Sequence, residues 1–386
     1  MHLRQADVNG EAKCMSELEV QNLVKRIHGK TVVDRISFRI AEDELLVLLG
    51  PAGSGKTTIL RLISGLDEPD TGRIILNGRN ISALEPQMRN IGVAFQDYKL
   101  YPNMNIFDNI AFGLQSRGVA RKEIETRITK VGEILGLTDM LKRSPASLAG
   151  GDLQRIALAR VMVKEADLYL FDQLIPYLEP RLRHRMRQEI VLLQRNRLKP
   201  SLYVTQDQHE AFAMSKRIGV ISQGRLLQIG TPDELLYRPA NLFVAQYLGE
   251  PPMNILEGLV RHVGARYQLF CGDIMVTLPT RWTRMLSRMG PQGRVFLGIR
   301  PGMLIPEWAA ATLNNTFFIL LRVQIRHVEP GIGRSTVQLM TSTGLELSAE
   351  FEDMPHIVLR YGQVITVGVD VERICFFHPQ TGELLS

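Results

Sequence analysis

Residues 44–66 constrain the fold of this chain more than any other segment. The apolar run ELLVLLG ends at Gly50, the loop GPAGSGKTT begins there, and TTILRLISGL follows with helical spacing. The pattern GxxxxGK[ST] is completed by Gly55, Lys56 and Thr57. Backbone N–H groups of such a loop and the N-terminus of the next helix can surround phosphate oxygens, while the lysine reaches the outer phosphates and the threonine ligates Mg²⁺. The sequence therefore predicts a strand, a phosphate-binding loop and a helix.

Apolar strand-like segments alternate with amphipathic helical segments from about residue 17 to residue 222. This alternation is typical of an α/β domain. DLYLFD (167–172) and SLYVT (201–205) have the short, fully apolar character of buried parallel strands. Between residues 97 and 149 a more helical insert is predicted, because apolar residues recur there at helical spacing, at Ile124, Ile128, Val131 and Leu135.

The last third of the chain has a different character. Short β-like segments are separated by Gly, Pro and Thr, as in GDIMVTL, GRVFLGI, RVQIRHVE, STVQLM and VITVGVDV. Such spacing indicates a small barrel or sandwich. We therefore divide the chain into an N-terminal extension (1–16), an α/β domain (17–248) and a β-rich domain (249–386).

Composition is that of a globular protein without membrane spans. Of the 386 residues, 45% are hydrophobic and 22% charged, and no apolar run reaches the length that crosses a bilayer. The first residues lack the apolar core of a signal peptide, so a cytoplasmic location is expected, and Met15 offers a second possible start. Cys14, Cys271 and Cys375 have no CxxC spacing, which predicts neither disulfides nor a metal site.

A formal charge of +6 permits attraction to polyanions. The densest basic stretch, RLRHRMRQE from Arg181, has its arginines two residues apart. Two-residue spacing distributes these side chains around a helix instead of along one face. We therefore expect a solvated helix and no nucleic-acid partner.

Five further segments resemble the ATP-binding subunits of ABC importers, specifically the maltose-type family that serves sugars and related solutes. VAFQDYKLYPNMNIFDNIAFGL resembles the family's Q-loop region, LAGGDLQRIALAR its signature motif and LYLFDQ its Walker B strand. RPANLFVAQYLGEPPMN and LGIRP resemble the transition into its C-terminal domain and a motif within that domain. The resemblance covers almost the whole chain. It implies a RecA-like P-loop domain with a helical subdomain, followed by a TOBE-type OB-fold region.

The resemblance also implies where ATP and Mg²⁺ bind. The expected nucleotide-binding residues are Gly50, Pro51, Ala52, Gly53, Ser54, Gly55, Lys56, Thr57, Thr58, Gln96 and Asp172. Three of these, Thr57, Gln96 and Asp172, are the expected Mg²⁺ ligands. In the family the signature reaches across a dimer to the partner's γ-phosphate, and here it comprises Leu148, Ala149, Gly150, Gly151 and Asp152. We expect Asp152 to cap the following helix.

Several motifs depart from the family's pattern. The catalytic glutamate after the Walker B aspartate is replaced by Gln173, and the histidine near the γ-phosphate by Gln206. An amide cannot act as a carboxylate base, and it lacks the proton chemistry of an imidazole. Ala149 replaces the signature serine, residues 176–179 (PYLE) replace the usual SNLD, and Ile27 corresponds to the aromatic residue that stacks on adenine.

These features favour an importer subunit that binds ATP but hydrolyses it poorly, paired with a competent ATPase subunit. The resemblance further implies two membrane-spanning permease subunits, an extracytoplasmic solute-binding protein and a peripheral position on the cytoplasmic face of the membrane. Two alternatives remain open at this point. One is a homodimeric ATPase with an unconventional base, and the other is a nucleotide sensor that regulates a transporter.

Overall fold

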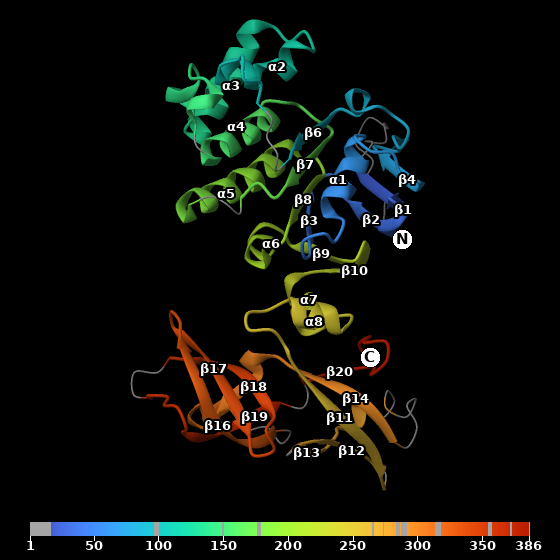
Figure 1. Ribbon diagram of the computed structural model, residues 1–386, viewed down its shortest axis with the longest axis vertical. Coiled ribbons are helices and arrows are strands. Elements are labelled where there is room, and N and C mark those ends of the chain that lie inside the picture. The colour runs from blue at the N-terminus through green and yellow to red at the C-terminus, as the bar shows by residue number, and fades with distance from the viewer. Residues whose placement is uncertain are drawn as a thin grey trace, which may run out of the picture. The chain divides into compact units, whose positions relative to one another are not determined.

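The structure, a computed structural model, describes residues 17–95, 100–148, 150–175, 179–264, 266–272, 274–282, 286, 292–312, 318–353, 357–370 and 373–385. The chain forms two compact units, one up to Pro232 and the other from Asp233 onward. Figure 1 shows both units, and each is described by itself below.

A six-stranded sheet forms the centre of the first unit. Its order is β10-β9-β3-β8-β7-β6, and all neighbours are parallel except β10 and β9. The strands are β3 (Leu45–Leu49), β6 (Ile91–Ala94), β7 (Leu168–Asp172), β8 (Ser201–Thr205), β9 (Arg217–Ser222) and β10 (Arg225–Gly230). Every residue of β3, β7 and β8 is buried, which explains why these strands are apolar throughout.

A four-stranded antiparallel sheet lies beside the central sheet. Its order is β2-β1-β4-β5, from β1 (Leu18–Ile27), β2 (Lys30–Ile40), β4 (Thr71–Leu76) and β5 (Arg79–Asn80). One hydrophobic cluster contains residues of both sheets and of α1 (Lys56–Ser64). The helix that follows the glycine loop is therefore fixed by apolar packing along its length.

Three helices gather at one end of the first unit (Figure 1): α2 (Ile106–Gln115), α3 (Arg121–Leu135) and α4 (Gly150–Met162). The apolar residues predicted to repeat at helical spacing are the buried face of α3. Short 3₁₀ segments, η2 (Thr138–Met140) and η3 (Pro145–Ser147), connect α3 to α4. The helical group extends beyond residue 149, because α4 packs against both other helices.

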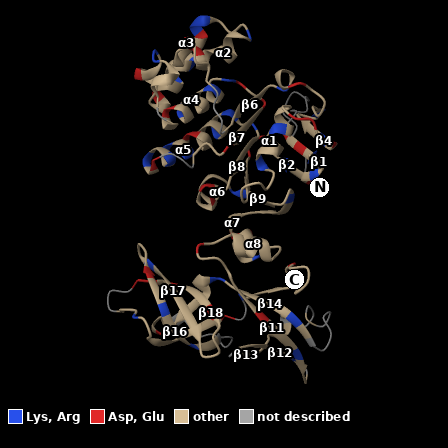
Figure 2. Cartoon of the chain, viewed as in Figure 1, with Lys and Arg blue, Asp and Glu red and all other residues tan. Residues whose placement is uncertain are grey.

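The remaining helices of this unit are α5 (Pro180–Arg197) and α6 (Gln208–Met214), with a 3₁₀ turn η1 (Pro86–Met88). Along α5, Met186, Ile190 and Leu193 are buried, while Arg181 and Arg185 are exposed. Figure 2 shows that basic residues occur along α5 and that residues of both charge signs are interspersed over the unit. The arginines of the basic stretch are thus distributed around a packed helix.

The second unit contains two five-stranded antiparallel sheets. One has the order β13-β12-β11-β14-β20, from β11 (Asn254–Val263), β12 (Arg266–Cys271), β13 (Ile274–Thr277), β14 (Gln292–Ile299) and β20 (Cys375–Phe377). The other has the order β15-β19-β16-β17-β18, from β15 (Leu304–Pro306), β16 (Phe318–Pro330), β17 (Arg334–Thr341), β18 (Glu346–Glu352) and β19 (Val364–Asp370). A single hydrophobic cluster joins both sheets. The predicted order of an α/β domain followed by a β-rich domain is confirmed.

Asn254 connects these two sheets by hydrogen bonds. Its Nδ2 donates to the carbonyl oxygens of Ile299 at 3.0 Å and Ser348 at 2.9 Å, and its Oδ1 accepts from the Ser348 backbone N–H at 2.7 Å. Short elements complete the unit: α7 (Pro232–Tyr237), α8 (Leu242–Tyr247), η4 (Thr280–Trp282), η6 (Pro301–Met303) and η7 (Glu307–Thr312).

The compact units divide about sixteen residues before the domain boundary drawn from the sequence. The reason is the packing of α8 within the second unit. Ala245 of α8 belongs to a hydrophobic cluster with Met253, Cys375 and Phe377. The change to short β-like segments in the sequence marks where the strands begin, whereas the compact unit also includes the helices that pack on those strands.

A buried arginine fixes the C-terminal end of α1. Arg89 is 3% exposed, and its Nη1 donates to the carbonyl oxygens of Leu62 and Ile63, both at 2.8 Å. Its Nε donates to Leu84 O at 2.7 Å and its Nη2 to Ser82 O at 2.9 Å. All three guanidinium nitrogens therefore bond to backbone oxygens, which holds the helix that follows the glycine loop.

We expect Arg89→Ala to lower the free energy of unfolding of the first unit by about 3 kcal/mol, because four hydrogen bonds to backbone carbonyls, two of them fully buried, are lost together. Thermal or urea unfolding of the full chain measures this effect. The matched control is Arg79→Ala, since Arg79 is exposed on β5. Equal destabilisation by the two substitutions would contradict the anchoring role of Arg89.

Candidate nucleotide site

The glycine loop lies between β3 and α1, as predicted. A Cβ on Gly50 would lie 2.1 Å from the backbone oxygen of Ile221, so a side chain cannot be accommodated there. Gly55, the residue before α1, has φ of 102°, and a Cβ on it would lie 2.6 Å from Val32 O. Both positions require glycine, because one excludes a side chain and the other combines close contact with left-handed backbone geometry.

The Lys56 side chain is folded back over this loop. Its Nζ donates to Gly50 O at 2.8 Å, Pro51 O at 2.7 Å and Ser54 Oγ at 3.1 Å. The residue is only 3% exposed, and its burial lowers the pKa of the ammonium from 10.5 to about 8, while Asp172 acts in the opposite direction. A desolvated cation at the start of a helix is well suited to attract an anionic ligand.

Asp172, the last residue of β7, meets Thr57 of α1 at the carboxyl edge of the central sheet. Thr57 Oγ1 donates to Asp172 Oδ1 at 3.3 Å, and Asp172 is buried. Hydroxyl and carboxylate oxygens are the hard donors that Mg²⁺ prefers. This pair therefore fits a Mg²⁺ ion, which would supply positive charge beside nucleotide phosphates when bound.

Gln173 and Gln206, the residues in place of the expected base and histidine, contact each other. Gln206 Nε2 donates to Gln173 Oε1 at 3.1 Å. The backbone of Gln173 has φ of 46° and its N–H donates to Val204 O at 3.0 Å, which fixes its position next to Asp172. The sequence did not predict this contact between the two amides. Neither amide can accept a proton near neutral pH as a carboxylate or an imidazole does.

A buried carboxyl group supports the segment that carries Gln206. Glu210 of α6 accepts hydrogen bonds at its Oε2 from Tyr203 Oη at 3.0 Å and Thr205 Oγ1 at 2.8 Å. Burial raises the pKa of Glu210. Asp207 caps α6 by accepting from the backbone N–H groups of residues 209 and 210. Sequence reasoning missed these supporting groups, although an Asp immediately before a helical segment is a recognisable capping signal.

The signature segment begins α4 in the helical group. Gly150 and Gly151 form the first turn of α4, and Leu148 precedes it. The expectation that Asp152 caps this helix is wrong. Asp152 lies inside the first turn and pairs with Arg155, whose Nη1 donates to Leu135 O and Gly136 O, both at 3.1 Å. Asp152 thus connects α4 to the end of α3 through this arginine.

Other predicted residues can be placed only in part. Ala52, Gly53 and Thr58 belong to the loop and the first turn of α1. Ile27 lies at the exposed end of β1, 37% exposed, away from the loop's hydrogen bonds. Outside the described residues lie Gln96, Ala149, Pro176, Tyr177 and Leu178, while Glu179 directly precedes α5.

Comparison with known proteins identifies the family of this chain. Residues 33–175 match the family model described as "ABC transporter". The trehalose/maltose import ATP-binding protein MalK of Thermococcus litoralis is 37% identical over 370 residues, which cover 94% of this chain and 98% of that protein. The chain belongs to the ABC transporter family.

Two further relatives carry the name sn-glycerol-3-phosphate import ATP-binding protein UgpC. The protein of Ralstonia nicotianae is 35% identical, with coverage of 95% of this chain and 98% of the relative. The protein of Yersinia pseudotuberculosis is 42% identical, with coverage of 74% and 79%. The resemblance read from the motifs is thus confirmed, and the similarity includes the β-rich second unit.

Solved structures confirm the ABC transporter fold of the first unit. An ATP-binding subunit of an ABC transporter has a TM-score of 0.53 at 24% identity, covering 56% of this chain and 91% of that chain. A bacterial ABC transporter cassette solved as a dimer has a TM-score of 0.52 at 23% identity, covering 55% and 98%.

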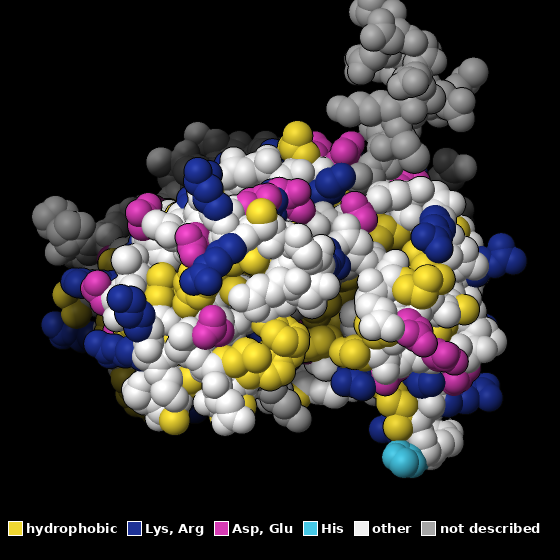
Figure 3. Space-filling view, turned by 90° about the horizontal axis from the view of Figure 1, so that it is seen from above, with side chains coloured by type: hydrophobic (Ala, Val, Ile, Leu, Met, Phe, Trp, Pro, Cys, Tyr) yellow, Lys and Arg dark blue, Asp and Glu magenta, His cyan; other side chains and the backbone are white. Residues whose placement is uncertain are grey.

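The first unit has a second concave surface, whose lining residues were not predicted from the sequence. It is a groove of about 410 Å³ between the edge strand β6 and helices α2 and α4, lined by apolar residues together with Arg160 and Lys164. Beside it, the rings of Tyr101 and Phe112 lie 4.7 Å apart and are both more than one third exposed. Figure 3, which looks at the end that carries α2 and α3, shows hydrophobic side chains gathered between charged ones.

None of the helices in the described part of the chain combines the length and apolar character needed to cross a bilayer.

The lowered pKa of Lys56 predicts a specific pH dependence of stability. Below pH 8 both the folded and the unfolded chain hold this proton, but between about 8 and 10.5 only the unfolded lysine remains protonated. Over this range the free energy of unfolding rises by up to about 1.4 kcal/mol per pH unit because of this group. We therefore expect the stability of the nucleotide-free chain, relative to Lys56→Met, to increase from pH 8 to pH 10.

Urea unfolding at a series of pH values measures this difference. The matched control is Lys30→Met, since Lys30 is exposed on β2 and its removal should give a difference that does not change with pH. A pH-independent difference between wild type and Lys56→Met would show that the lysine is not desolvated in the folded chain.

Proposed function

We propose that this chain is the ATP-binding subunit of an importer for sugars or related solutes, that it binds MgATP, and that its own site hydrolyses ATP slowly. The observation that carries the proposal is the arrangement at the carboxyl edge of the central sheet. Lys56, Thr57 and Asp172 meet there with the glycine loop, and an amide pair stands where a base is needed.

Binding of MgATP is supported by complementary charge and hydrogen bonding. The loop directs backbone groups and the start of α1 toward phosphates, and the desolvated Lys56 ammonium supplies positive charge. Its three present acceptors are neutral oxygens, so phosphate oxygens are stronger partners for the same donors. Thr57 and Asp172 would hold the Mg²⁺ ion.

Slow hydrolysis follows from the chemistry of Gln173 and Gln206. Attack on the γ-phosphate requires a water molecule that is oriented and loses its proton. The Gln173 side chain can orient water by a hydrogen bond, but its carbonyl oxygen is engaged by Gln206. Absence of a general base typically costs about 10²–10⁴-fold in rate.

Two subunits are proposed to share the nucleotide sites. A cassette of the same fold has been solved as a dimer, and the name of each relative above describes an import ATP-binding protein. In a pair, the signature at the start of α4 would face the partner's phosphates, where the backbone donors of Gly150 and Gly151 remain. An importer needs one productive site, so we propose a partner ATPase with an intact glutamate.

The groove beside β6 is the surface we assign to the membrane-spanning partners. It combines exposed aromatic rings with a cation, since Arg160 lies 5.6 Å from the ring centroid of Tyr101. An amphipathic helix of a permease subunit with an acidic end would fit it. The chain would then lie at the cytoplasmic face of the membrane, bound to two permease subunits that receive solute from an extracytoplasmic binding protein.

We expect the purified chain to bind ATP with Mg²⁺ but to show little turnover, and Gln173→Glu combined with Gln206→His to raise turnover by at least about 10²-fold. Steady-state phosphate release measures turnover, and titration with a fluorescent nucleotide measures binding. Lys56→Ala should abolish binding, because it removes the phosphate-facing cation.

The matched control is Gln188→Glu, which adds the same charge on the exposed face of α5 and should leave turnover unchanged. Robust turnover by the unmodified chain would contradict the slow-hydrolysis proposal. Equal nucleotide affinity of wild type and Lys56→Ala would remove the basis of the assigned site.

In the assembled transporter we expect turnover to depend on the partner's catalytic glutamate and hardly at all on Gln173. Transport-coupled ATPase activity of reconstituted complexes gives the comparison. A Glu→Gln change in the partner should reduce activity by about 10²-fold or more, whereas Gln173→Ala should change it less than about threefold. Loss of activity on Gln173→Ala with no effect of the partner's substitution would reverse the assignment. A complex that holds two copies of this chain would exclude the mixed pair.

A further inference from the structure

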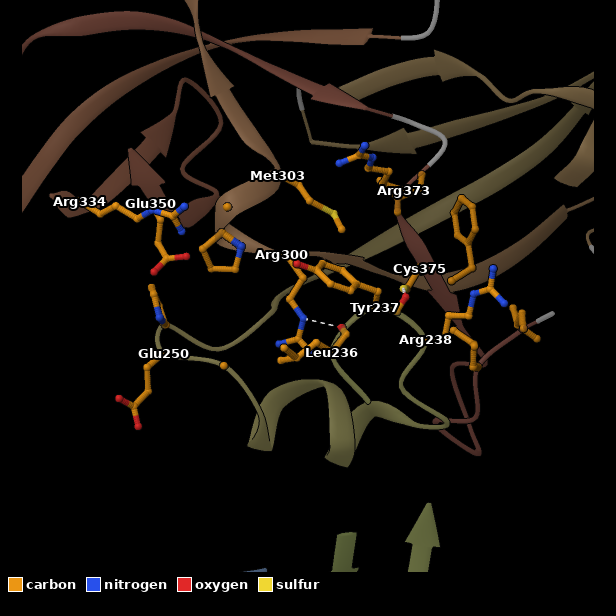
Figure 4. Close-up of a pocket in the computed structure, with 18 of the residues that line it drawn as sticks. Leu236, Tyr237, Arg238, Glu250, Arg300, Met303, Arg334, Glu350, Arg373 and Cys375 are labelled. Carbon is orange, nitrogen blue, oxygen red and sulfur yellow. Dashed lines mark hydrogen bonds between the residues drawn. The ribbon is translucent and has the colours of Figure 1, made fainter. Parts of the chain in front are cut away.

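A large cavity of about 950 Å³ lies within the second unit, remote in sequence from the glycine loop. Its wall is formed by α7, the loop before β11, η6, the edges of β17 and β18, and the region of β20 (Figure 4). Volumes of this size are typical of sites for small organic ligands. None of the features assigned to nucleotide binding or permease contact uses this cavity.

Arginine side chains dominate the polar part of the wall. Figure 4 shows Arg300 in the middle, Arg334 and Glu350 on one side, and Arg238 and Arg373 on the other. Together with Glu250, these are the charged lining residues, so arginines outnumber glutamates four to two. The apolar part of the wall comprises Tyr237, Met303, Ile374, Phe376 and Leu385 among others.

Arg300 is the most buried of these arginines, at 6% exposure. Its Nε donates to Leu236 O at 2.8 Å, and its Nη1 donates to Ala245 O at 3.0 Å and to Leu248 O. Its Nη2 is buried and has no hydrogen-bond partner among the residues that the structure describes. The two N–H donors on Nη2, of the five in the guanidinium group, are thus unsatisfied by the described residues, which is costly for a buried cation.

Arg89 of the first unit shows what a satisfied buried arginine looks like in the same chain. Arg89 bonds through all three nitrogens, and it lines none of the cavities described for this chain. Arg300 makes three hydrogen bonds through two of its nitrogens, and its third nitrogen has no partner among the described residues although Arg300 lines the cavity. A purely structural role therefore accounts for Arg89 but not for the whole of Arg300.

No acidic group neutralises Arg300 among the residues that the structure describes. The nearby Cys375 thiol does not do so, because burial raises its pKa to about 11. Burial also lowers the pKa of Arg300 to about 10, so the guanidinium stays charged near neutral pH. The cavity wall therefore holds an uncompensated buried positive charge.

The arginines at the mouth are held only weakly by their neighbours. Arg334 lies 3.5 Å from Glu352, and Arg373 lies 3.5 Å from Asp370, and both arginine side chains are mostly exposed. Such long, exposed ion pairs contribute little to stability. Both guanidinium groups can turn toward a ligand without loss of the fold.

We propose that this cavity binds a small organic anion, a phosphate ester or carboxylate with an apolar or ring portion. The anionic group would lie among the arginines, which match phosphate and carboxylate oxygens by paired hydrogen bonds. The apolar portion would contact the Tyr237 and Phe376 side, and Glu350 can accept hydrogen bonds from hydroxyl groups. Such binding goes beyond the proposed nucleotide function.

Isothermal titration of the full chain without nucleotide tests this inference. The probes are glucose 6-phosphate and citrate, with glucose as the neutral control and inorganic phosphate as the anion without an organic part. We expect saturable binding of at least one organic anion, no binding of glucose, and weaker binding of phosphate. The double variant Arg334→Gln with Arg373→Gln should weaken the binding by at least about tenfold.

Matched variants separate the cavity from general charge effects. Arg322→Gln removes an exposed arginine of β16 that does not line the cavity. The affinity of this variant for the organic anion should equal that of the wild-type chain. Glu350→Gln removes from the cavity wall a negative charge that repels an anionic ligand, and it should tighten binding of the anion by a few-fold. Lys56→Ala should leave the binding intact, which separates this site from the nucleotide site.

Two outcomes would overturn the inference. One is absence of binding of glucose 6-phosphate and of citrate to the wild-type chain at millimolar concentration. The other is binding with equal affinity by wild type and by the folded double variant, which would place the anion elsewhere. Failure of ATP binding would not affect either result, because the titration contains no nucleotide.

Discussion

The parallel pairing of β3, β8 and β7 determines where every polar group of the candidate nucleotide site lies. Leu49 pairs with Thr205, and Asp172 pairs with Val204, so the three strands end at one edge of the sheet. The glycine loop, the Walker-type carboxylate and the segment with Gln206 all leave from this edge. A shift of one residue in the pairing of β7 with β8 would turn the Asp172 carboxylate to the other face of the sheet, and the Thr57–Asp172 contact would be lost.

Sequence reasoning reached the strands and helices of this edge because their signals are local. The apolar runs, the glycine pattern and the helical spacing each lie within about ten residues, so β3, α1, β7 and α3 were all predicted. The Gln173–Gln206 contact joins residues 33 positions apart through the strand order, which no local pattern encodes. The assignment of Asp152 as a cap failed because α4 already begins at Gly150, so that Asp152 lies inside its first turn and pairs with Arg155 of the same helix.

The amide pair is the reason for our proposal that this site keeps ligand affinity while its hydrolysis is slow. In the proposed site, nucleotide affinity would depend on the loop backbone, Lys56 and the oxygen donors of Thr57 and Asp172, and these groups interact with one another directly. Proton transfer would depend on two other positions, those of Gln173 and Gln206, whose side chains bond to each other. The two sets of groups share a position on the sheet but not a role. Substitution of the second set therefore need not disturb the first, and a subunit that retains bound nucleotide as a clamp is physically consistent with this arrangement.

Three buried cations of the chain differ in a way that separates structural from ligand-binding roles. Lys56, Arg89 and Arg300 are each less than 10% exposed, and each donates to backbone oxygens. Arg89 has all three guanidinium nitrogens bonded to backbone oxygens and lines none of the cavities described for the chain. Lys56 is satisfied only by folding back onto the loop that it would leave when phosphate arrives. Within the described part of the chain, one buried nitrogen of Arg300 is unbonded beside an arginine-lined cavity. A buried charge without a complete set of acceptors raises the free energy of the folded state, and a bound anion is the simplest means by which that cost is removed.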